Sequence, residues 1–376
     1  MKKALYIGGF LMPDGNAAAQ RVLGIGKLLK ECNYSVRFCG LSRNISIPEK
    51  GEFDGFEYIN YPYPTSFKSW YKYLTGRDNS IKEILNYKPD ILIVYNHPAL
   101  AIEHLTKFCH LHGIKIIADV TEWYKPAGNL IFRTIKEADT TRRMTKSHKQ
   151  LDGLICISNF LTEYYKKNYI PIINIPPLVD IKQSKWQYTP IKDSNVVKIL
   201  YAGSPGSKKD RLDLIIKALD EVLPKVKNQV KFDIIGITQE QYQTNWNDKK
   251  DYPFITFHGR IEHNEVIKYL SNADFQIFLR PNTLPNRAGF PTKFVETITS
   301  STLPITNLSS NLSEYLIDNT NGFIITSLEL SSIKESLIKA LNLSYDNLIK
   351  MKSHIKSDTF DYHKYITTFK NFLSSI

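Results

Sequence analysis

Residues 198–226 have the sequence KILYAGSPGSKKDRLDLIIKALDEVLPKV, and this stretch predicts a strand, a loop and a helix in succession. Lys198–Ala202 is a short apolar run of the kind that forms a buried strand, and Leu212–Val226 has apolar residues at helical spacing. Between them lies a loop of small residues that ends in Lys208 and Lys209. A strand that leads through such a loop into a helix is the repeating unit of a parallel α/β sheet.

The same alternation of strands and helices extends through the chain. In the first half the predicted strands are Ala4–Gly8, Ser35–Cys39, Ile91–Tyr95, Ile114–Asp119 and Gly153–Ile157. In the second half they are Lys198–Ala202, Phe232–Gly236, Ile255–His258, Phe275–Leu279 and Leu303–Thr306. Two such series predict an α/β protein with two Rossmann-like domains, each a doubly wound parallel sheet, facing a cleft.

A proline-containing polar stretch from Pro176-Pro177 to Pro190 separates the two series. We therefore expect an N-terminal domain over residues 1–185 and a C-terminal domain over residues 186–358. We expect residues 359–376 to form a helix that packs back toward the N-terminal domain. The length of 376 residues suits two domains of ordinary size.

Composition narrows the class of protein. Hydrophobic residues make up 42% and charged residues 23%, which is typical of a globular protein rather than a disordered or fibrous one. No stretch reaches the roughly 18 apolar residues of a membrane-spanning helix. The four cysteines show no C-x-x-C spacing and lie among apolar neighbours, which predicts reduced thiols, no zinc site and a cytoplasmic location.

The charge is unevenly distributed. The chain carries 49 Lys and Arg against 37 Asp and Glu, a net +12. Residues 1–185 hold 26 of the basic and 17 of the acidic side chains, so most of the excess lies in the first half. Such an excess favours an anionic partner, such as phosphates, acidic lipids or nucleic acid, although solubility alone also explains it.

Ligands of parallel sheets bind where strands end and helices begin, so the loops after strands are the candidate sites. Gly203 and Ser204, followed by Lys208 and Lys209, form a cationic loop suited to phosphate. The alternative is a solvated lysine pair. The loop before Ala17 includes Gly15 and Asn16, but it lacks the G-x-G-x-x-G pattern of nicotinamide and flavin dehydrogenases.

A second candidate loop follows the strand Phe275–Leu279. It begins with Arg280-Pro281 and continues through Asn286 to a helix that carries Lys293 and Glu296 three residues apart, on one helix face. A lysine there can neutralise a diphosphate, and a carboxylate can accept hydrogen bonds from ribose hydroxyls. The alternative is a surface ion pair worth about 0.2–0.5 kcal/mol.

Together these residues resemble the retaining glycosyltransferases of family 4, also called group 1. The resemblance covers nearly the whole chain and rests on Gly203, Lys208-Lys209, Gly259 and the segment from Gly289 to Glu296. In the first half it includes Gly15-Asn16 with Arg21, the strand that ends in Ile157-Ser158, and residues 175–180, IPPLVD. It implies the GT-B fold, with the donor nucleotide held by the second domain and the acceptor by the first.

Residue by residue, the resemblance implies that Lys209, assisted by Lys208, contacts the donor diphosphate and that Glu296 holds the ribose. Arg260 and Ile261 lie where the family contacts the base. The backbone amides of Phe290, Pro291 and Thr292, after Gly289, would face the diphosphate or the sugar. The family's first motif glutamate is replaced by Ala288 and its second glycine by Pro291, so Arg287, Asn286 or Lys293 would have to take over that glutamate's part.

The sequence also predicts how the leaving group is stabilised. No D-x-D occurs, so we expect no metal and no cofactor, with Lys209, Lys293 and helix dipoles stabilising the departing UDP or GDP. No paired carboxylates stand beside the donor motifs, so we expect front-face attack by the acceptor hydroxyl rather than a protein nucleophile.

Candidate acceptor residues follow the middle strands of the first half. His97 follows Ile91–Tyr95, and Asp119 and Glu122 lie at the end of the next strand. Each is a candidate to orient or deprotonate an acceptor hydroxyl, whereas helix capping or pairing with Lys125 is the structural alternative for the carboxylates.

Basic and aromatic segments suggest a membrane-resting surface. Residues Arg133–Lys149 carry a net +4, and Tyr61–Leu74 interleaves lysines with aromatic residues. These features suit a lipid-linked acceptor at the inner face of the cell membrane, whereas a solvated helix beside a core aromatic cluster is the alternative.

The leading hypothesis is therefore a metal-independent glycosyltransferase of the hexosyltransferase type, acting in cell-surface polysaccharide synthesis. The alternatives are a sugar-nucleotide 2-epimerase of the same fold, a non-catalytic sugar-nucleotide-binding protein, suggested by Ala288, and a nucleic-acid-binding protein. Against the last, no helix-turn-helix or RNP-like run occurs, so we expect no nucleic-acid partner.

Overall fold

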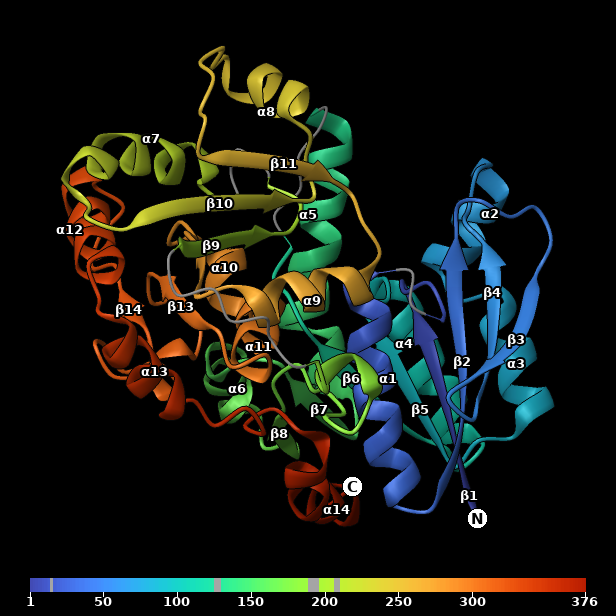
Figure 1. Cartoon of the computed structure of the whole chain (residues 1–376). Helices are drawn as coiled ribbons and strands as arrows, with labels where there is room; N and C mark the ends of the chain where they lie inside the picture. Colours follow the sequence, from blue (N-terminus) through green and yellow to red (C-terminus); the bar gives the residue numbers. More distant parts are fainter. Residues whose placement is uncertain (14–15, 125–129, 189–195, 206–209) are drawn as a thin grey trace. The chain divides into compact units, whose positions relative to one another are not determined.

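The computed structural model describes residues 1–13, 16–124, 130–188, 196–205 and 210–376. The chain divides into two compact units (Figure 1). The first contains Met1–Val179, Arg287–Phe290 and Asp361–Ile376, and the second contains Asp180–Asn286 and Pro291–Phe360. Each unit is built on its own sheet.

The described part of the first unit forms an eight-stranded sheet in the order β3-β4-β2-β1-β5-β6-β7-β8. The strands are β1 Lys2–Gly8, β2 Tyr34–Ser42, β3 Glu49–Phe53, β4 Phe56–Pro62, β5 Ile91–Tyr95, β6 Lys115–Val120, β7 Gly153–Cys156 and β8 Ile172–Asn174. Every pairing is parallel except that of β3 with β4. The helices are α1 Ala17–Glu31, α2 Phe67–Leu74, α3 Asn79–Tyr87, α4 Ala99–Leu111, α5 Leu130–Thr145, α6 Asn159–Tyr165 and α14 Ile366–Ser374.

Sequence patterns explain the central elements of this unit. Strands β1 and β5 are almost wholly apolar and buried on both faces, as a central parallel strand requires. Helix α1 begins at Asn16, whose side chain accepts a hydrogen bond from the Ala19 amide at 2.9 Å. Helix α14 contacts α1 and β8, so the end of the chain completes the first unit (Figure 1).

The described part of the second unit forms a six-stranded parallel sheet in the order β11-β10-β9-β12-β13-β14. The strands are β9 Val196–Ala202, β10 Gln229–Ile235, β11 Ile255–Gly259, β12 Phe275–Phe278, β13 Leu303–Thr306 and β14 Phe323–Ile324. The helices are α7 Leu212–Val222, α8 Gln239–Trp246, α9 His263–Asn272, α11 Thr292–Thr299, α12 Leu330–Leu341 and α13 Tyr345–Ser353, and α10 Leu284–Ala288 runs across the division between the units. Helix α7 packs on α12, and α9 packs on α11 (Figure 1).

The predicted fold class is confirmed, because both units are parallel α/β sheets of the Rossmann type. All ten predicted strands are present, with ends that shift by a few residues. The sequence analysis missed β3, β4, β8 and β14. Strand β3 lies at the sheet edge and is mostly exposed, so it has no alternating apolar pattern to detect. None of the described helices is both long and apolar enough to cross a membrane.

Candidate functional site

A buried ionic cluster lies at the end of β9 in the second unit. The Lys293 ammonium, from the first turn of α11, pairs with the carboxylate of Asp210. It also donates a hydrogen bond to the hydroxyl oxygen of Tyr201 at 3.0 Å, and that hydroxyl donates to Asp210 at 2.8 Å. Because Tyr201 is on β9 and Asp210 precedes α7, three separate elements converge on one ammonium group.

The backbone at Gly203 makes room for this lysine. Gly203 has φ +147°, and a Cβ there would lie 2.5 Å from Cε of Lys293 and 2.6 Å from its Nζ. A larger residue would therefore displace the ammonium group. The sequence analysis placed Gly203 in a loop suited to phosphate. In the structure Gly203 also leaves the space that the Lys293 side chain occupies.

The charges in the cluster are mutually stabilised. Burial raises the pKa of Asp210, but the Lys293 charge and hydrogen bonds from Lys293 and Tyr201 outweigh that effect and hold it below its ordinary value. Burial and the Asp210 charge raise the pKa of Tyr201 well above its ordinary value. The tyrosine therefore stays protonated and the aspartate ionised, so that Lys293 keeps its place.

Arg280, two residues after the end of β12, supplies a buried cation. The residue is 7% exposed, and Nη2 donates to Oδ1 of Asn286 at 2.8 Å. Among the described residues, no hydrogen-bond partner meets its Nη1. Burial lowers the pKa of Arg280 to about 10, so the guanidinium remains charged at neutral pH. A buried, charged donor without a partner is costly, and an anionic ligand would supply the missing acceptor.

Glu296 lies one turn after Lys293 on α11. Its Oε1 is 2.9 Å from Nε2 of His263, the first residue of α9. The two side chains are 23% and 31% exposed, respectively, so the carboxylate is fixed from one side and accessible from another. Arg260 is exposed and Ile261 half-buried in the loop between β11 and α9.

The remaining residues that were predicted to bind the donor do not all lie in the second unit. Ser204 is exposed, Pro291 is the residue before α11, and Thr292 begins that helix. Residues Arg287–Phe290 group with the first unit, where Ser158 Oγ donates to the Ala288 carbonyl at 2.6 Å and the Arg287 guanidinium lies 5.3 Å from the Phe160 ring centre. Gly15, Lys208 and Lys209 lie outside the described residues, so their assignments stay predictions.

In the first unit, Arg21 and Asp119 form a buried ion pair. Arg21 Nη2 and Nε donate to Asp119 at 2.8 Å and 3.1 Å, and Nη1 donates to the carbonyls of Ile175 and Pro176. The hydroxyl of Tyr6 also donates to Asp119 at 2.6 Å. These contacts tie α1 to β1, β6 and the segment after β8. These contacts give Arg21 and Asp119 a structural role, and their predicted roles at the acceptor stay predictions.

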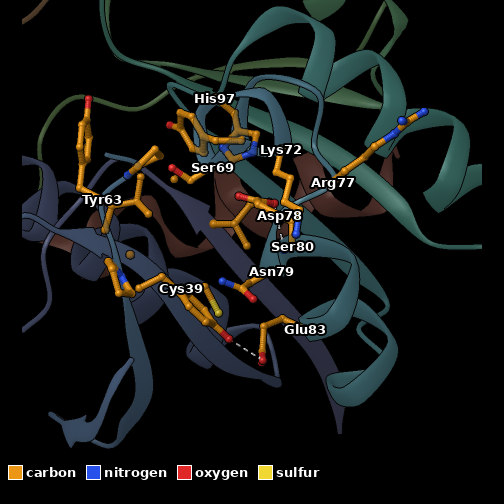
Figure 2. Close-up of a pocket in the computed structure, with 18 of the residues that line it drawn as sticks. Cys39, Tyr63, Ser69, Lys72, Arg77, Asp78, Asn79, Ser80, Glu83 and His97 are labelled. Atoms are coloured by element: carbon orange, nitrogen blue, oxygen red, sulfur yellow. Dashed lines mark hydrogen bonds between the residues drawn. The ribbon is translucent and has the colours of Figure 1, made fainter. Parts of the chain in front are cut away.

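A cavity of about 370 Å³ lies at the carboxyl ends of β1, β2 and β4 (Figure 2). Its lining combines aromatic, hydroxyl, amide and charged side chains: Tyr61, Tyr63, Ser66, Ser69, Lys72, Tyr73, Arg77, Asp78, Asn79, Glu83 and His97, among others. In Figure 2 the Lys72 side chain extends toward Asp78 and Ser80, whereas Arg77 points away from this group. Such a cavity, with a few polar groups that converge beside aromatic side chains, is a candidate site for a small molecule.

His97 is the least satisfied polar residue of this cavity. It is 2% exposed, and neither ring nitrogen has a hydrogen-bond partner within the part of the chain that the structure describes. Burial lowers the pKa of His97, and the opposing charges of Asp78 and Asp139 do not restore it. A neutral imidazole has one donor and one acceptor nitrogen, and it can bind a hydroxyl with either. Glu122, by contrast, accepts from Asn96 at 3.3 Å.

The sequence analysis missed several residues of these sites. Tyr201, Asp210 and His263 were not assigned, and the cavity residues Tyr63 and Tyr73 were considered only as part of the aromatic segment Tyr61–Leu74. Asp210 had a signal, since it directly follows the lysine pair at the start of a helix. His263 had none, because only the packing of α9 on α11 brings it to Glu296.

Residues 183–357 match the family model described as "Glycosyl transferases group 1". This segment is therefore similar to the group 1 glycosyl transferases. The match covers most of the second unit, which holds the ionic cluster, Arg280 and Glu296. A sequence comparison with curated proteins finds no match.

Solved structures of sugar-transfer proteins resemble the whole chain. The Anabaena protein Alr3699/HepE, in complex with UDP and glucose, matches with a TM-score of 0.67 at 12% identity, covering 100% of both chains. The lipopolysaccharide outer core galactosyltransferase WaaB matches with a TM-score of 0.66 at 16% identity, covering 99% of both. Sucrose-phosphate synthase from Thermosynechococcus elongatus matches with a TM-score of 0.69 at 12% identity, covering 100% of this chain and 98% of that one. At these identities the likeness establishes the fold, which is GT-B.

Proposed function

We propose that the protein is a retaining glycosyltransferase of family 4, which moves a sugar from a nucleoside-diphosphate sugar to a glycan or lipid-linked acceptor. The observation that carries this proposal is a pair of cations in the segment that matches the group 1 model: Lys293, whose side chain is 17% exposed, and Arg280, which is buried. Both side chains are held by neighbours, and Arg280 keeps a buried donor without a partner among the described residues. Such preorganised donors are suited to an anion that appears during the reaction.

The donor diphosphate is assigned to Lys293 and Arg280, with Lys208 and Lys209 as further predicted contacts. Negative charge on the diphosphate grows as its bond to the sugar breaks. Asp210 and Tyr201 hold the Lys293 ammonium before the reaction begins, so little reorganisation is needed at that moment. Glu296 is assigned to the ribose hydroxyls, and Arg260 with Ile261 to the base.

The acceptor is assigned to the cavity of the first unit. Tyr63 and Tyr73 offer aromatic faces, and Ser69 and Asn79 offer hydrogen bonds to hydroxyl groups. His97 would accept a hydrogen bond from the attacking hydroxyl, because its neutral form has an unprotonated nitrogen. We propose front-face attack by that hydroxyl, with retention of the anomeric configuration.

We further propose a cytoplasmic enzyme of polysaccharide synthesis that rests on the inner face of the membrane. Two helices of the first unit expose apolar side chains beside lysines and arginines: Phe67 is 90% and Tyr71 50% exposed on α2, and Leu130 is 75% and Ile135 58% exposed on α5. Such surfaces bind anionic lipid interfaces. Co-sedimentation with vesicles containing phosphatidylglycerol, but not with phosphatidylcholine vesicles, is expected, and loss of binding in Phe67→Ser would support the assignment to α2.

Two measurements test the proposed function. Thermal-shift screening should give strong stabilisation by UDP or GDP and none by unrelated nucleotides. Incubation with the matching nucleotide sugars should then release the nucleoside diphosphate in the presence of EDTA, with product NMR showing a retained anomer. Complete, metal-reversible loss of turnover would refute the metal-free mechanism. Stabilisation by a sugar nucleotide without any transfer would favour the non-catalytic alternative that Ala288 suggests.

A further inference from the structure

A histidine outside the predicted site touches the carboxylate assigned to the ribose. His263 is the first residue of α9, and its Nε2 lies 2.9 Å from Oε1 of Glu296 on α11. Helices α9 and α11 pack together, which places the two side chains 33 positions apart in the sequence within hydrogen-bond distance.

The surroundings of the ring indicate which nitrogen carries the proton. Nδ1 of His263 is buried and has no hydrogen-bond partner in the described ranges. A neutral imidazole has one N–H donor and one acceptor nitrogen, and a buried N–H without an acceptor is costly. The proton therefore belongs on Nε2, which donates to Glu296. The N–H group of His263 therefore donates to Oε1 of Glu296, and within the described part of the chain the other oxygen of this carboxylate remains available to a ligand.

We propose that His263 is a positioning residue for nucleotide recognition: it orients the Glu296 carboxylate so that the remaining acceptor sites meet the ribose hydroxyls. This inference rests on the proposed function, since it needs Glu296 to bind the ribose. Glu296 has a long side chain on a helix surface and many rotamers, and the hydrogen bond from His263 selects among them. If the Glu296 side chain already has its binding conformation in the free protein, less conformational entropy is lost when the nucleotide binds.

A purely structural role makes a different prediction from a positioning role. If the pair only joins α9 to α11, its loss weakens every nucleotide equally through the fold. If His263 orients Glu296 toward the ribose, its loss acts on the hydroxyl contacts alone. Comparing a ribonucleotide with its 2′-deoxy form separates the two roles, because the deoxy form lacks one of the hydroxyls concerned.

The experiment is titration calorimetry of the full chain with UDP and GDP and with their 2′-deoxy forms. The variants are His263→Ala, His263→Gln, which retains an N–H donor, and Glu296→Gln. Lys268→Ala is the matched control, because it removes the exposed Lys268–Glu265 pair from the same helix. We expect His263→Ala to weaken ribonucleotide binding about two- to tenfold, the range for one hydrogen bond. We also expect it to reduce the preference for ribose over deoxyribose, with recovery in His263→Gln and no change in Lys268→Ala.

The outcomes separate this inference from the proposed function. If Glu296→Gln loses the ribose preference while His263→Ala keeps it, the positioning role is wrong and the site assignment stands. Equal weakening of ribo- and deoxyribonucleotides in His263→Ala shows a structural role and also overturns the inference. If Glu296→Gln binds both forms as the wild type does, the ribose assignment fails and the inference falls with it.

Discussion

Arg21 in the first unit and Arg280 in the second are both buried arginines beside a sheet, yet their hydrogen bonding differs. Each guanidinium nitrogen of Arg21 donates to Asp119 or to the carbonyls of Ile175 and Pro176. Arg280 donates through Nη2 to Asn286, whereas its Nη1 meets no partner among the described residues. The two residues are 4% and 7% exposed, so burial does not distinguish them.

The difference shows how a buried charge signals structure or function. A buried guanidinium whose three nitrogens all have partners in the fold has little capacity left for a ligand. One that keeps a buried donor unused carries a cost that an anionic ligand removes. Both residues are arginines, so it is their hydrogen-bond partners that distinguish a structural role from a ligand-binding role.

Removing Arg21 should give the largest loss of stability. Arg21→Ala leaves Asp119 buried without its cation, and we expect the free energy of unfolding to fall by about 3–5 kcal/mol in urea denaturation. Lys166→Ala is the control, because it removes a pair with Glu163 at 3.3 Å in the same unit, and both of these side chains are exposed. We expect a change of at most about 1 kcal/mol there. Equal effects of the two substitutions would contradict the structural role of Arg21.

Removing Lys293 should act on the chemical step as well as on stability, because Asp210 is left buried without its cation. We expect Lys293→Ala to lower kcat roughly a hundredfold or more, since losing one preorganised partner of the leaving group costs about 3–4 kcal/mol of barrier. Nucleotide affinity should change less. Lys209→Ala is expected to behave likewise, and Ala288→Glu tests donor-sugar choice. Nucleoside diphosphate release at wild-type rates by both lysine variants would refute the proposed diphosphate site.

Removing Glu296 should weaken binding without a large loss of stability. Its side chain is partly exposed, and its observed partner is His263. We expect Glu296→Ala to reduce the affinity for UDP or GDP by about 1.5–3 kcal/mol, the range for hydrogen bonds to a charged group. Calorimetry measures this directly. Unchanged affinity would mean that the ribose lies elsewhere.

Burial of His97 should lower the free energy of unfolding at acid pH. Burial holds its pKa in the folded protein below the value of about 6.5 in the unfolded chain. As the pH falls below about 6.5 the unfolded chain takes up a proton that folded His97 does not, so stability falls toward acid pH. In urea denaturation at pH 7.5 and 5.5, His97→Gln should lose less stability than the wild type. His148, whose pKa burial also lowers, retains its own contribution in both proteins. An identical pH dependence would show that His97 is protonated in the fold.

The fold was predictable because its central strands are short continuous apolar runs, separated by helical patterns. Ile91–Tyr95 and Lys198–Ala202 are buried on both faces, and their composition shows it. Edge strand β3 was missed because its residues are mostly exposed and pair only with β4. In the described structure, Asp361–Ile376 groups with the first unit.

The site was predictable only where chain order places residues together. Lys293 and Glu296 share one turn of one helix, so their spacing alone predicted a common face. Tyr201 and His263 are far from Lys293 and Glu296 in sequence. A tyrosine on a buried strand and a histidine at the start of a helix are both common in proteins without a functional role. Only the tertiary structure brings Tyr201 to Lys293 and His263 to Glu296.

The sequence by itself determined the alternation of strands and helices, the α/β class and the loops that hold candidate phosphate-binding cations, because these depend on local periodicity and on residue type. Only the tertiary structure decided which charges are satisfied. It paired Arg21 with Asp119, secured Lys293 with Asp210 and Tyr201, and left donors of Arg280 and His97 without partners in the described residues. The physical reason is that the cost of a buried polar group depends on its neighbours in space, and those neighbours come from distant parts of the chain.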